Sequence, residues 1–223
     1  MTNIDNLEIL KFKLIVVGDQ NTGKSCILNR FANNTFQENY QATIGLDFQT
    51  KNVTIHNQDI RLTLYDTAGQ EKFRSLIPMY IREAQIILLV YDITNKESFD
   101  SIPKWFSDIL NVKNDEAVFV LIGNKIDLTN NRKISYNEGK RLANEKNIIF
   151  EELSAKNGTN FNDLFNNRIF EAVYKKFKNK FDDIEKIQNN NNYESTESNE
   201  IQLKNIKMDN NNEIKKKRKK KCC

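Results

Sequence analysis

The sequence has little of what a disulfide-bonded, zinc-binding or membrane-spanning protein needs. Its 223 residues include three cysteines and one histidine. Three cysteines provide no disulfide framework, so we expect a reducing compartment. His56 has no second histidine or cysteine at ligand spacing, which predicts an exposed turn residue rather than a zinc ligand. The longest apolar runs, such as IILLV at 86–90, are too short to span a bilayer, and no N-terminal stretch has the apolar core of a signal peptide.

Positive charge is concentrated at one end of the chain. Acidic and basic residues balance over residues 1–177, so the net charge of +4 comes from residues 178–223. A nucleic-acid-binding body would carry a basic face of its own, so we expect no nucleic-acid partner. The last residues read KKKRKKKCC, at 215–223. A nuclear-localisation signal needs the cations but not the cysteines, whereas a disulfide or metal site needs the cysteines but not the cations.

Short β-branched runs alternate with amphipathic segments along most of the chain. Strands are predicted at 12–17, 53–66, 85–93, 117–123 and 147–153, the second with a hairpin turn at HNQD, and helices at 24–34, 98–112, 136–146 and 160–177. The last helix carries an apolar residue every four positions: Phe161, Phe165, Ile169, Val173 and Phe177. This alternation predicts an α/β fold, a six-stranded and mostly parallel sheet with helices on both faces, whose ligands lie beyond the carboxyl ends of the strands.

The character of the sequence changes after this segment. Residues 8–178 are predicted to form one domain. Residues 179–221 are polar, rich in asparagine and without periodicity, which predicts a disordered, hypervariable linker that ends in the basic run. Residues 222–223, the two terminal cysteines, are kept apart from this linker.

The segment GDQNTGKS at 18–25 follows the first strand and opens the first helix. Gly18 and Gly23 leave room for backbone N–H groups to close around phosphate oxygens, so the pattern predicts a P-loop NTPase. Lys24 would bridge two phosphates and Ser25 would hold Mg²⁺. Asn21, Thr22 and Cys26 complete the predicted nucleotide-binding set of this loop, although Cys26 is expected to fill the core rather than to act as a nucleophile.

Two further motifs follow strand ends. In DTAGQ at 66–70, Asp66 is placed to bind Mg²⁺, the Gly69 N–H to meet a γ-phosphate, and Gln70 to orient the attacking water. In NKID at 124–127, the Asp127 carboxylate can accept two donors of guanine that adenine does not offer.

The remaining predicted base contacts come from the same region. Lys125 would cover the base, and Asn124 would tie its loop to the phosphate loop. SAK, which is Ser154, Ala155 and Lys156, adds the Ala155 N–H for the guanine O6.

The four motifs in this order resemble the Ras-like small GTPases, and specifically the Rab branch, over residues 8–177. The resemblance implies the small G-protein fold and a switch that binds GTP or GDP with Mg²⁺ and hydrolyses GTP. It implies that Thr43 binds Mg²⁺ and senses the γ-phosphate, so that Gln70, Lys24 and Thr43 carry catalysis. It also implies that Phe36 packs on the base and that Tyr40 covers the phosphates.

The resemblance extends to the surface that such proteins show to effectors. QATIGLDF at 41–48 is similar to the first switch of Rab proteins, and the implied effector contacts are Ile44, Gly45, Phe48, Tyr65 and Tyr80. The runs YQATIG and SLIP, with Gln20, resemble the Golgi-acting Rab subgroup. Tyr65 stands where that family usually has tryptophan, which puts effector choice in doubt.

The resemblance makes the basic ending interpretable. Two terminal cysteines imply geranylgeranylation of Cys222 and Cys223 by a geranylgeranyltransferase, with presentation by a Rab escort protein. Two lipid chains and seven cations anchor a protein stably to an anionic membrane surface. We therefore expect the cytoplasmic face of a Golgi membrane, with a cytosolic pool held by a GDP-dissociation inhibitor. An exchange factor, a GTPase-activating protein and effectors complete the implied partners.

Two alternatives stay open at this point. One is a soluble GTPase of the nuclear-transport type, with the basic run as its nuclear signal. The other is a non-enzymatic scaffold that holds GTP permanently.

Overall fold

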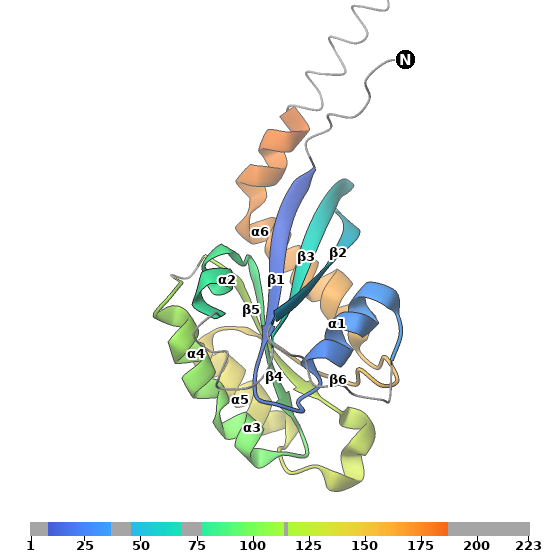
Figure 1. Cartoon of the computed structure of the whole chain (residues 1–223), viewed down its shortest axis with the longest axis vertical. Coiled ribbons are helices and arrows are strands. Elements are labelled where there is room, and N and C mark those ends of the chain that lie inside the picture. Colours follow the sequence, from blue (N-terminus) through green and yellow to red (C-terminus); the bar gives the residue numbers. More distant parts are fainter. Residues whose placement is uncertain (1–8, 37–45, 68–76, 114–115, 187–223) are drawn as a thin grey trace, which may run out of the picture. The chain divides into compact units, whose positions relative to one another are not determined.

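A computed structural model of the chain describes residues 9–36, 46–67, 77–113 and 116–186 (Figure 1). Its elements in chain order are β1 (Leu10–Val17), α1 (Lys24–Asn33), β2 (Leu46–Ile55), β3 (Gln58–Thr67), α2 (Ile77–Glu83), β4 (Ile86–Asp92), α3 (Lys96–Asp100), α4 (Ile102–Leu110), β5 (Val118–Asn124), the 3-10 helix η2 (Ile126–Asn131), α5 (Tyr136–Lys146), β6 (Ile149–Leu153), the π-helix η3 (Asp163–Ile169) and α6 (Phe170–Lys176). All of them lie in the unit Ile9–Lys178, and the described part of a second unit, 179–186, is helical. Among the described residues, no helix combines the length and the apolar content that a bilayer span requires.

The centre of the fold is a sheet in the strand order β2-β3-β1-β4-β5-β6. β2 is antiparallel to β3, and every other neighbouring pair is parallel. Every residue of β4 and β5 is buried, as expected for central parallel strands that are covered on both faces. The predicted fold class is therefore confirmed. Because the parallel strands end at one edge, the loops after β1, β3, β4, β5 and β6 come together there.

Helices cover both faces of this sheet (Figure 1). On one face, buried residues of α2, α4 and α5, among them Ile81, Trp105 and Ala143, form a single apolar core with β1, β4 and β5. On the other face, Phe31 of α1 stacks on Phe165 of η3 with ring centroids 4.2 Å apart. The apolar surface of each helix is thus removed from water, which is the main term that stabilises such a layered fold.

Local sequence signals set several element boundaries. The side chain of Asn95 accepts the backbone N–H of Glu97 and caps α3. Ser135 and Glu138 form a reciprocal capping box at the start of α5. The β2–β3 hairpin turns at His56 and Asn57, which have φ values of 48° and 63°. Positive φ at both central residues is the conformation that a tight two-residue hairpin requires.

Strand β2 is longer than the sequence predicted. It begins at Leu46, whereas the predicted strand began at residue 53. β2 is an edge strand that pairs only with β3, and Asp47, Phe48 and Thr50 have exposed side chains. The first part of β2, LDFQTKN, has two apolar residues and then only polar ones, which is too short an alternation to give a clear strand signal. The short elements α2 and η2 were not predicted either.

The predicted helix 98–112 is two helices. α3 ends at Asp100 and α4 begins at Ile102, with Ser101 between them. Pro103 lies in the first turn of α4 and has no N–H to donate to the preceding turn. Proline is tolerated at that position and not in a helix interior, which explains the break.

The predicted helix 160–177 is a π-helix followed by an α-helix. Phe161, Phe165, Ile169 and Val173 are all buried, as the apolar stripe predicted. A π-helix has more residues per turn than an α-helix. The combination therefore keeps residues four positions apart on one face.

The predicted linker began at residue 179, but residues 178–186 are helical. Within this stretch, Lys186 forms an ion pair with Asp183 at 3.5 Å, three positions away on the helix surface. The asparagine-rich sequence that suggested a linker begins only at residue 189. The predicted disorder of the remaining linker, up to residue 221, falls outside the described residues.

Candidate functional site

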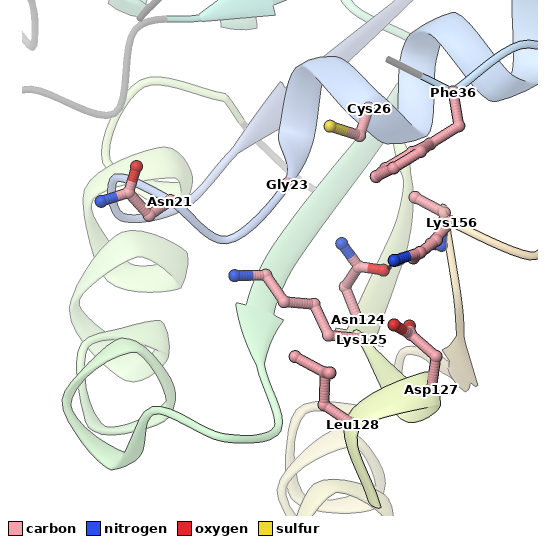
Figure 2. A pocket seen from close by; sticks show the side chains of 10 residues that line it. Asn21, Gly23, Cys26, Phe36, Asn124, Lys125, Asp127, Leu128 and Lys156 are labelled. Atoms are coloured by element: carbon pink, nitrogen blue, oxygen red, sulfur yellow. Dashed lines mark hydrogen bonds between the residues drawn. The ribbon is translucent and has the colours of Figure 1, made fainter. Parts of the chain in front are cut away.

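A cavity of about 310 Å³ lies at the carboxyl edge of the sheet, between the loop after β1 and the loops after β5 and β6 (Figure 2). Its lining residues are Asn21, Gly23, Cys26, Phe36, Asn124, Lys125, Asp127, Leu128, Ala155 and Lys156. All of them except Leu128 were assigned to a nucleotide site from the sequence. The sequence analysis did not assign Leu128, because a leucine directly after NKID carries no chemical group that marks it as a ligand contact. In the structure its side chain is exposed.

The loop after β1 depends on two glycines. Gly18 has φ 139°, and a β-carbon there would lie 2.2 Å from the carbonyl oxygen of Val90. Gly23 has φ 90°, and its β-carbon would lie 2.3 Å from Nδ2 of Asn124. Gly23 also precedes α1 without any side-chain cap for that helix. The first N–H groups of α1 are therefore left for an anion in the loop, and the helix dipole favours negative charge there.

Lys24, the first residue of α1, is nearly buried, and its Nζ donates to the backbone carbonyl of Asp19 at 2.7 Å. Burial lowers the pKa of this ammonium group from its usual value to about 8, against the opposing effect of the charges on Asp66 and Asp19. Lys24 does not line the 310 Å³ cavity. In this structure the ammonium group of Lys24, the predicted phosphate ligand, is therefore bound by a backbone carbonyl of its own loop.

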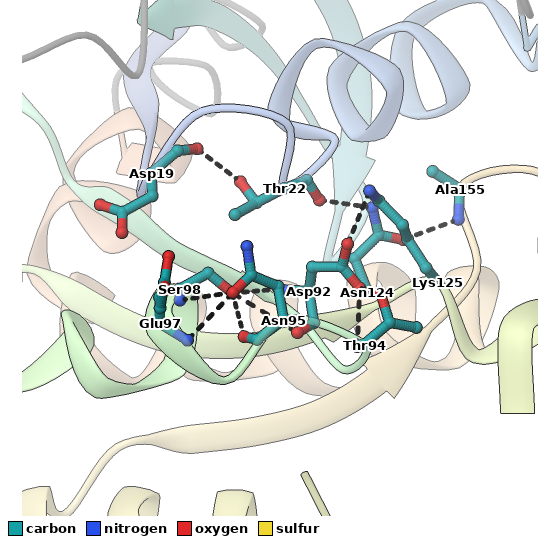
Figure 3. A network of polar contacts seen from close by, with 10 residues as sticks. All are labelled: Asp19, Thr22, Asp92, Thr94, Asn95, Glu97, Ser98, Asn124, Lys125 and Ala155. Carbon is teal, nitrogen blue, oxygen red and sulfur yellow. Dashed lines mark hydrogen bonds and ion pairs between the residues drawn. The ribbon is translucent and has the colours of Figure 1, made fainter. Parts of the chain in front are cut away.

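Asn124, at the end of β5, joins three loops (Figure 3). Its Nδ2 donates to the carbonyl of Thr22 at 2.8 Å, and its Oδ1 accepts the N–H of Ala155 at 3.1 Å. Both Asn124 and Thr22 are buried. This is the link between loops that the sequence predicted for Asn124. The contact of the Ala155 N–H with guanine O6 stays a prediction, and in this structure that amide donates to the Asn124 oxygen.

Asp127 follows β5 and has an exposed carboxylate at the cavity wall. Its Oδ1 accepts a hydrogen bond from the hydroxyl of Ser154 at 2.6 Å, and Ser154 is fully buried. The Ser154 oxygen in turn accepts the N–H of Asn157 at 3.2 Å. The carboxylate is therefore oriented by a buried group while it stays accessible to donors in the cavity.

Lys125 is oriented by an acid that the sequence analysis did not identify. Its backbone has φ 72°, and its Nζ lies 2.7 Å from Oδ2 of Asp92, whose side chain is only 9% exposed (Figure 3). The other oxygen of Asp92 accepts both the N–H and the hydroxyl of Thr94, each at 2.8 Å. The signal in the sequence was a carboxylate directly after the apolar run of β4.

A second, smaller cavity of about 60 Å³ lies beside α1 and β3. Its oxygen-bearing side chains include Ser25 and Asp66, both predicted as metal ligands, and Asp47, which was not. Hydroxyl and carboxylate oxygens are the ligands that Mg²⁺ prefers, so these residues fit that ion. No group of three or more histidine, cysteine or acidic residues in the described part of the chain is arranged to hold a metal.

Three predicted effector contacts form a row of aromatic rings. The ring centroids of Phe48 and Tyr65 are 6.3 Å apart, and those of Tyr65 and Tyr80 are 5.3 Å apart. Phe48 is 64% exposed. The row runs across β2, β3 and α2. Phe48 lines the smaller cavity, and Tyr65 and Tyr80 are half-buried against the core.

Cys26 was expected to fill the core, but it lines the larger cavity as a half-buried thiol. Burial raises its pKa, which keeps it protonated. The other predicted site residues lie outside the described residues: Tyr40, Thr43, Ile44, Gly45, Gly69, Gln70, Cys222 and Cys223.

Comparison with known protein families gives one finding. The model of the Ras family matches residues 13–175 of this chain. The matched region contains both cavities and all three loops that meet at the larger one.

Proposed function

Because the chain belongs to the Ras family, and is therefore a GTPase that binds GTP and GDP with Mg²⁺, we propose that it is a Rab-type switch on an intracellular membrane. In its GTP form it recruits effectors that act in vesicle traffic, and hydrolysis to GDP releases them. One observation carries the proposed nucleotide site: the loops of GDQNTGKS, NKID and SAK surround a single cavity.

The cavity accommodates the two parts of a guanine nucleotide at its two ends. The phosphates lie at the N–H groups that begin α1, with the ammonium of Lys24 held beside them by the Asp19 carbonyl. The base lies at the other end, where the Asp127 carboxylate accepts the N1–H and N2–H₂ of guanine. Lys125 covers the base with its aliphatic stem while Asp92 holds its ammonium group.

In hydrolysis, water attacks the γ-phosphorus, the bond to the β-phosphate oxygen breaks, and GDP and phosphate leave. Gln70 orients the water, and Ser25, Asp66 and Thr43 would hold Mg²⁺. When bound, that ion supplies positive charge that neutralises phosphate oxygens. No arginine lines either cavity in the part of the chain that the structure describes. Unassisted turnover is therefore slow, about 10⁻⁴ s⁻¹, and a GTPase-activating protein raises it strongly.

The Rab assignment rests on the switch-like segment QATIGLDF and on the terminal cysteines. The aromatic row of Phe48, Tyr65 and Tyr80 provides the effector surface. Cys222 and Cys223 carry the lipid anchor, added by a geranylgeranyltransferase with an escort protein, and a GDP-dissociation inhibitor extracts the lipidated chain. The runs YQATIG and SLIP favour the Golgi as the membrane.

The catalytic role is tested with Gln70→Leu in single-turnover hydrolysis of bound GTP. The variant should bind GTP as tightly as the wild type and release phosphate at least about 10-fold more slowly, because only the orientation of water is lost. Gln202→Leu, the same substitution in the tail, is the control. Wild-type phosphate release by Gln70→Leu would refute the role of Gln70.

The anchor is tested by replacing both Cys222 and Cys223 with serine and fractionating cells. The wild type should sediment with membranes and the variant should stay in the supernatant, because the basic run alone does not hold a protein stably. Membrane sedimentation of the variant would place the anchor elsewhere. Accumulation of the wild type in nuclei would favour the nuclear-transport alternative.

A further inference from the structure

Trp105, the single tryptophan of the chain, connects a core helix to the phosphate loop. It lies on α4 and is only 3% exposed. Its indole Nε1–H donates to Oδ1 of Asp19 at 2.8 Å, across 86 residues of sequence. A hydrogen bond to an ionised acceptor is roughly twice as strong as one between neutral groups. The loop is therefore tied to the side of the fold that α4 covers.

Asp19 also binds the side chain of Lys24. Its carbonyl oxygen accepts the Lys24 ammonium at 2.7 Å and the Thr22 hydroxyl at 3.0 Å (Figure 3 shows the contact between Asp19 and Thr22). The carboxylate end of Asp19 is thus fixed by α4, and the carbonyl end fixes the lysine. A shift of the Asp19 side chain would move the carbonyl that places Lys24.

We propose that Trp105 is a positioning residue for nucleotide binding: through its hydrogen bond to Asp19 it holds the phosphate loop in the conformation that presents Lys24 to phosphates. The inference rests on the proposed function only in that Lys24 contacts phosphate at this site. The indole ring also fills the core, and Trp105→Phe removes buried volume together with the donor. Asp19→Ala and Asp19→Asn leave that packing unchanged, so they separate the hydrogen bond from the core role.

The experiment measures the dissociation rate of a fluorescent GDP analogue from the full-length protein. Trp105→Phe and Asp19→Ala should each raise the rate about 10- to 100-fold, the effect of one hydrogen bond to a charged group. The double variant should be no faster than either single variant, because both break the same bond. Asp19→Asn keeps an acceptor oxygen for the indole and should restore the rate to within about twofold of the wild type.

The matched control is Phe106→Leu on the same helix, where Phe106 is buried against Phe119 with ring centroids 5.4 Å apart. It should lower the melting temperature and leave the GDP dissociation rate unchanged. If Trp105→Phe behaves in the same way, or if the double variant shows additive effects, the inference is overturned. Asp19→Ala tests the bond from the loop side should Trp105→Phe fail to fold.

Lys24→Ala separates this inference from the proposed site. If Lys24→Ala dissociates GDP no faster than the wild type, the phosphate assignment itself is wrong. If it dissociates GDP much faster while Trp105→Phe and Asp19→Ala do not, only the role of Trp105 fails.

Discussion

At the end of the cavity proposed to hold the base, side chains are held by other side chains, whereas at the end proposed to hold the phosphates the loop holds its lysine with its backbone. The base end takes its groups from the ends of β5 and β6. There Asp127 is bonded to the Ser154 hydroxyl and Lys125 to the Asp92 carboxylate. The phosphate end is a glycine-containing loop whose Asp19 carbonyl accepts Lys24.

This difference corresponds to two tasks in the proposed binding mode. Reading a base requires donors and acceptors in one arrangement, and only side chains can supply a carboxylate. Binding a phosphate requires positive charge and N–H groups, which the start of any helix supplies. We therefore expect substitution of the base-reading carboxylate to change selectivity, and substitutions at the phosphate end to change overall affinity.

The largest expected effect is that of Asp127→Asn, which tests whether the carboxylate at the base end determines selectivity. An amide cannot accept both guanine donors, but its NH₂ group can donate to the carbonyl that xanthine carries at the same position. The ratio of affinities for guanosine and xanthosine diphosphates should fall by on the order of 10⁴. Competition of each nucleotide against a fluorescent GDP analogue measures it.

The control is Asp163→Asn, the same change at an aspartate of η3 that lies outside both cavities and accepts a hydrogen bond from Asn167. It should leave the ratio at its wild-type value. An unchanged ratio for Asp127→Asn would contradict the assignment of the base end.

The second prediction uses pH to test the phosphate end. Only the protonated form of Lys24 attracts phosphate, and burial places its pKa at about 8 in the free protein. Phosphate raises that pKa in the complex, so binding takes up a proton above this pH. GDP affinity should therefore be at its maximum below about pH 8 and fall by up to about tenfold per pH unit above it.

Titration of GDP binding by calorimetry between about pH 7 and about pH 9 measures this dependence. Lys24→Arg provides the control, because arginine stays charged throughout this range and its affinity should not change with pH. A flat profile for the wild type would show that Lys24 does not carry the phosphate affinity.

The sequence predicted the sheet, its strand directions and most of the cavity lining, because these follow from local patterns. Buried parallel strands appear as continuous apolar runs, and the motifs follow those runs directly. The sequence did not predict the first part of β2, because an edge strand with exposed side chains contains no continuous apolar run. The break at Ser101 was missed although Pro103 marks it in the sequence.

What the sequence could not predict are contacts between distant residues. Asp92 meets Lys125 because β4 and β5 are neighbours in a register that pairs Asp92 with Asn124. Trp105 meets Asp19 because α4 packs beside the phosphate loop. Both contacts join elements that no local pattern relates, so neither contact could be identified from the sequence.

The smallest expected effect separates two roles at the base end, covering the base and reading its donors. Asp92→Asn keeps an oxygen that can accept the Thr94 N–H and removes the charge that holds Lys125. Dissociation of GDP should become about fivefold faster, because a partly buried ion pair is lost. Inosine diphosphate, which lacks the N2 amine, should be affected equally, since Lys125 contacts the ring face and not its donors. The control is Asp100→Asn, which breaks an exposed pair with Lys96 at 2.6 Å and should change neither rate.

A change in the ratio of the dissociation rates of GDP and inosine diphosphate would make Asp92 part of base recognition. An unchanged GDP dissociation rate would show that the position of Lys125 does not depend on Asp92.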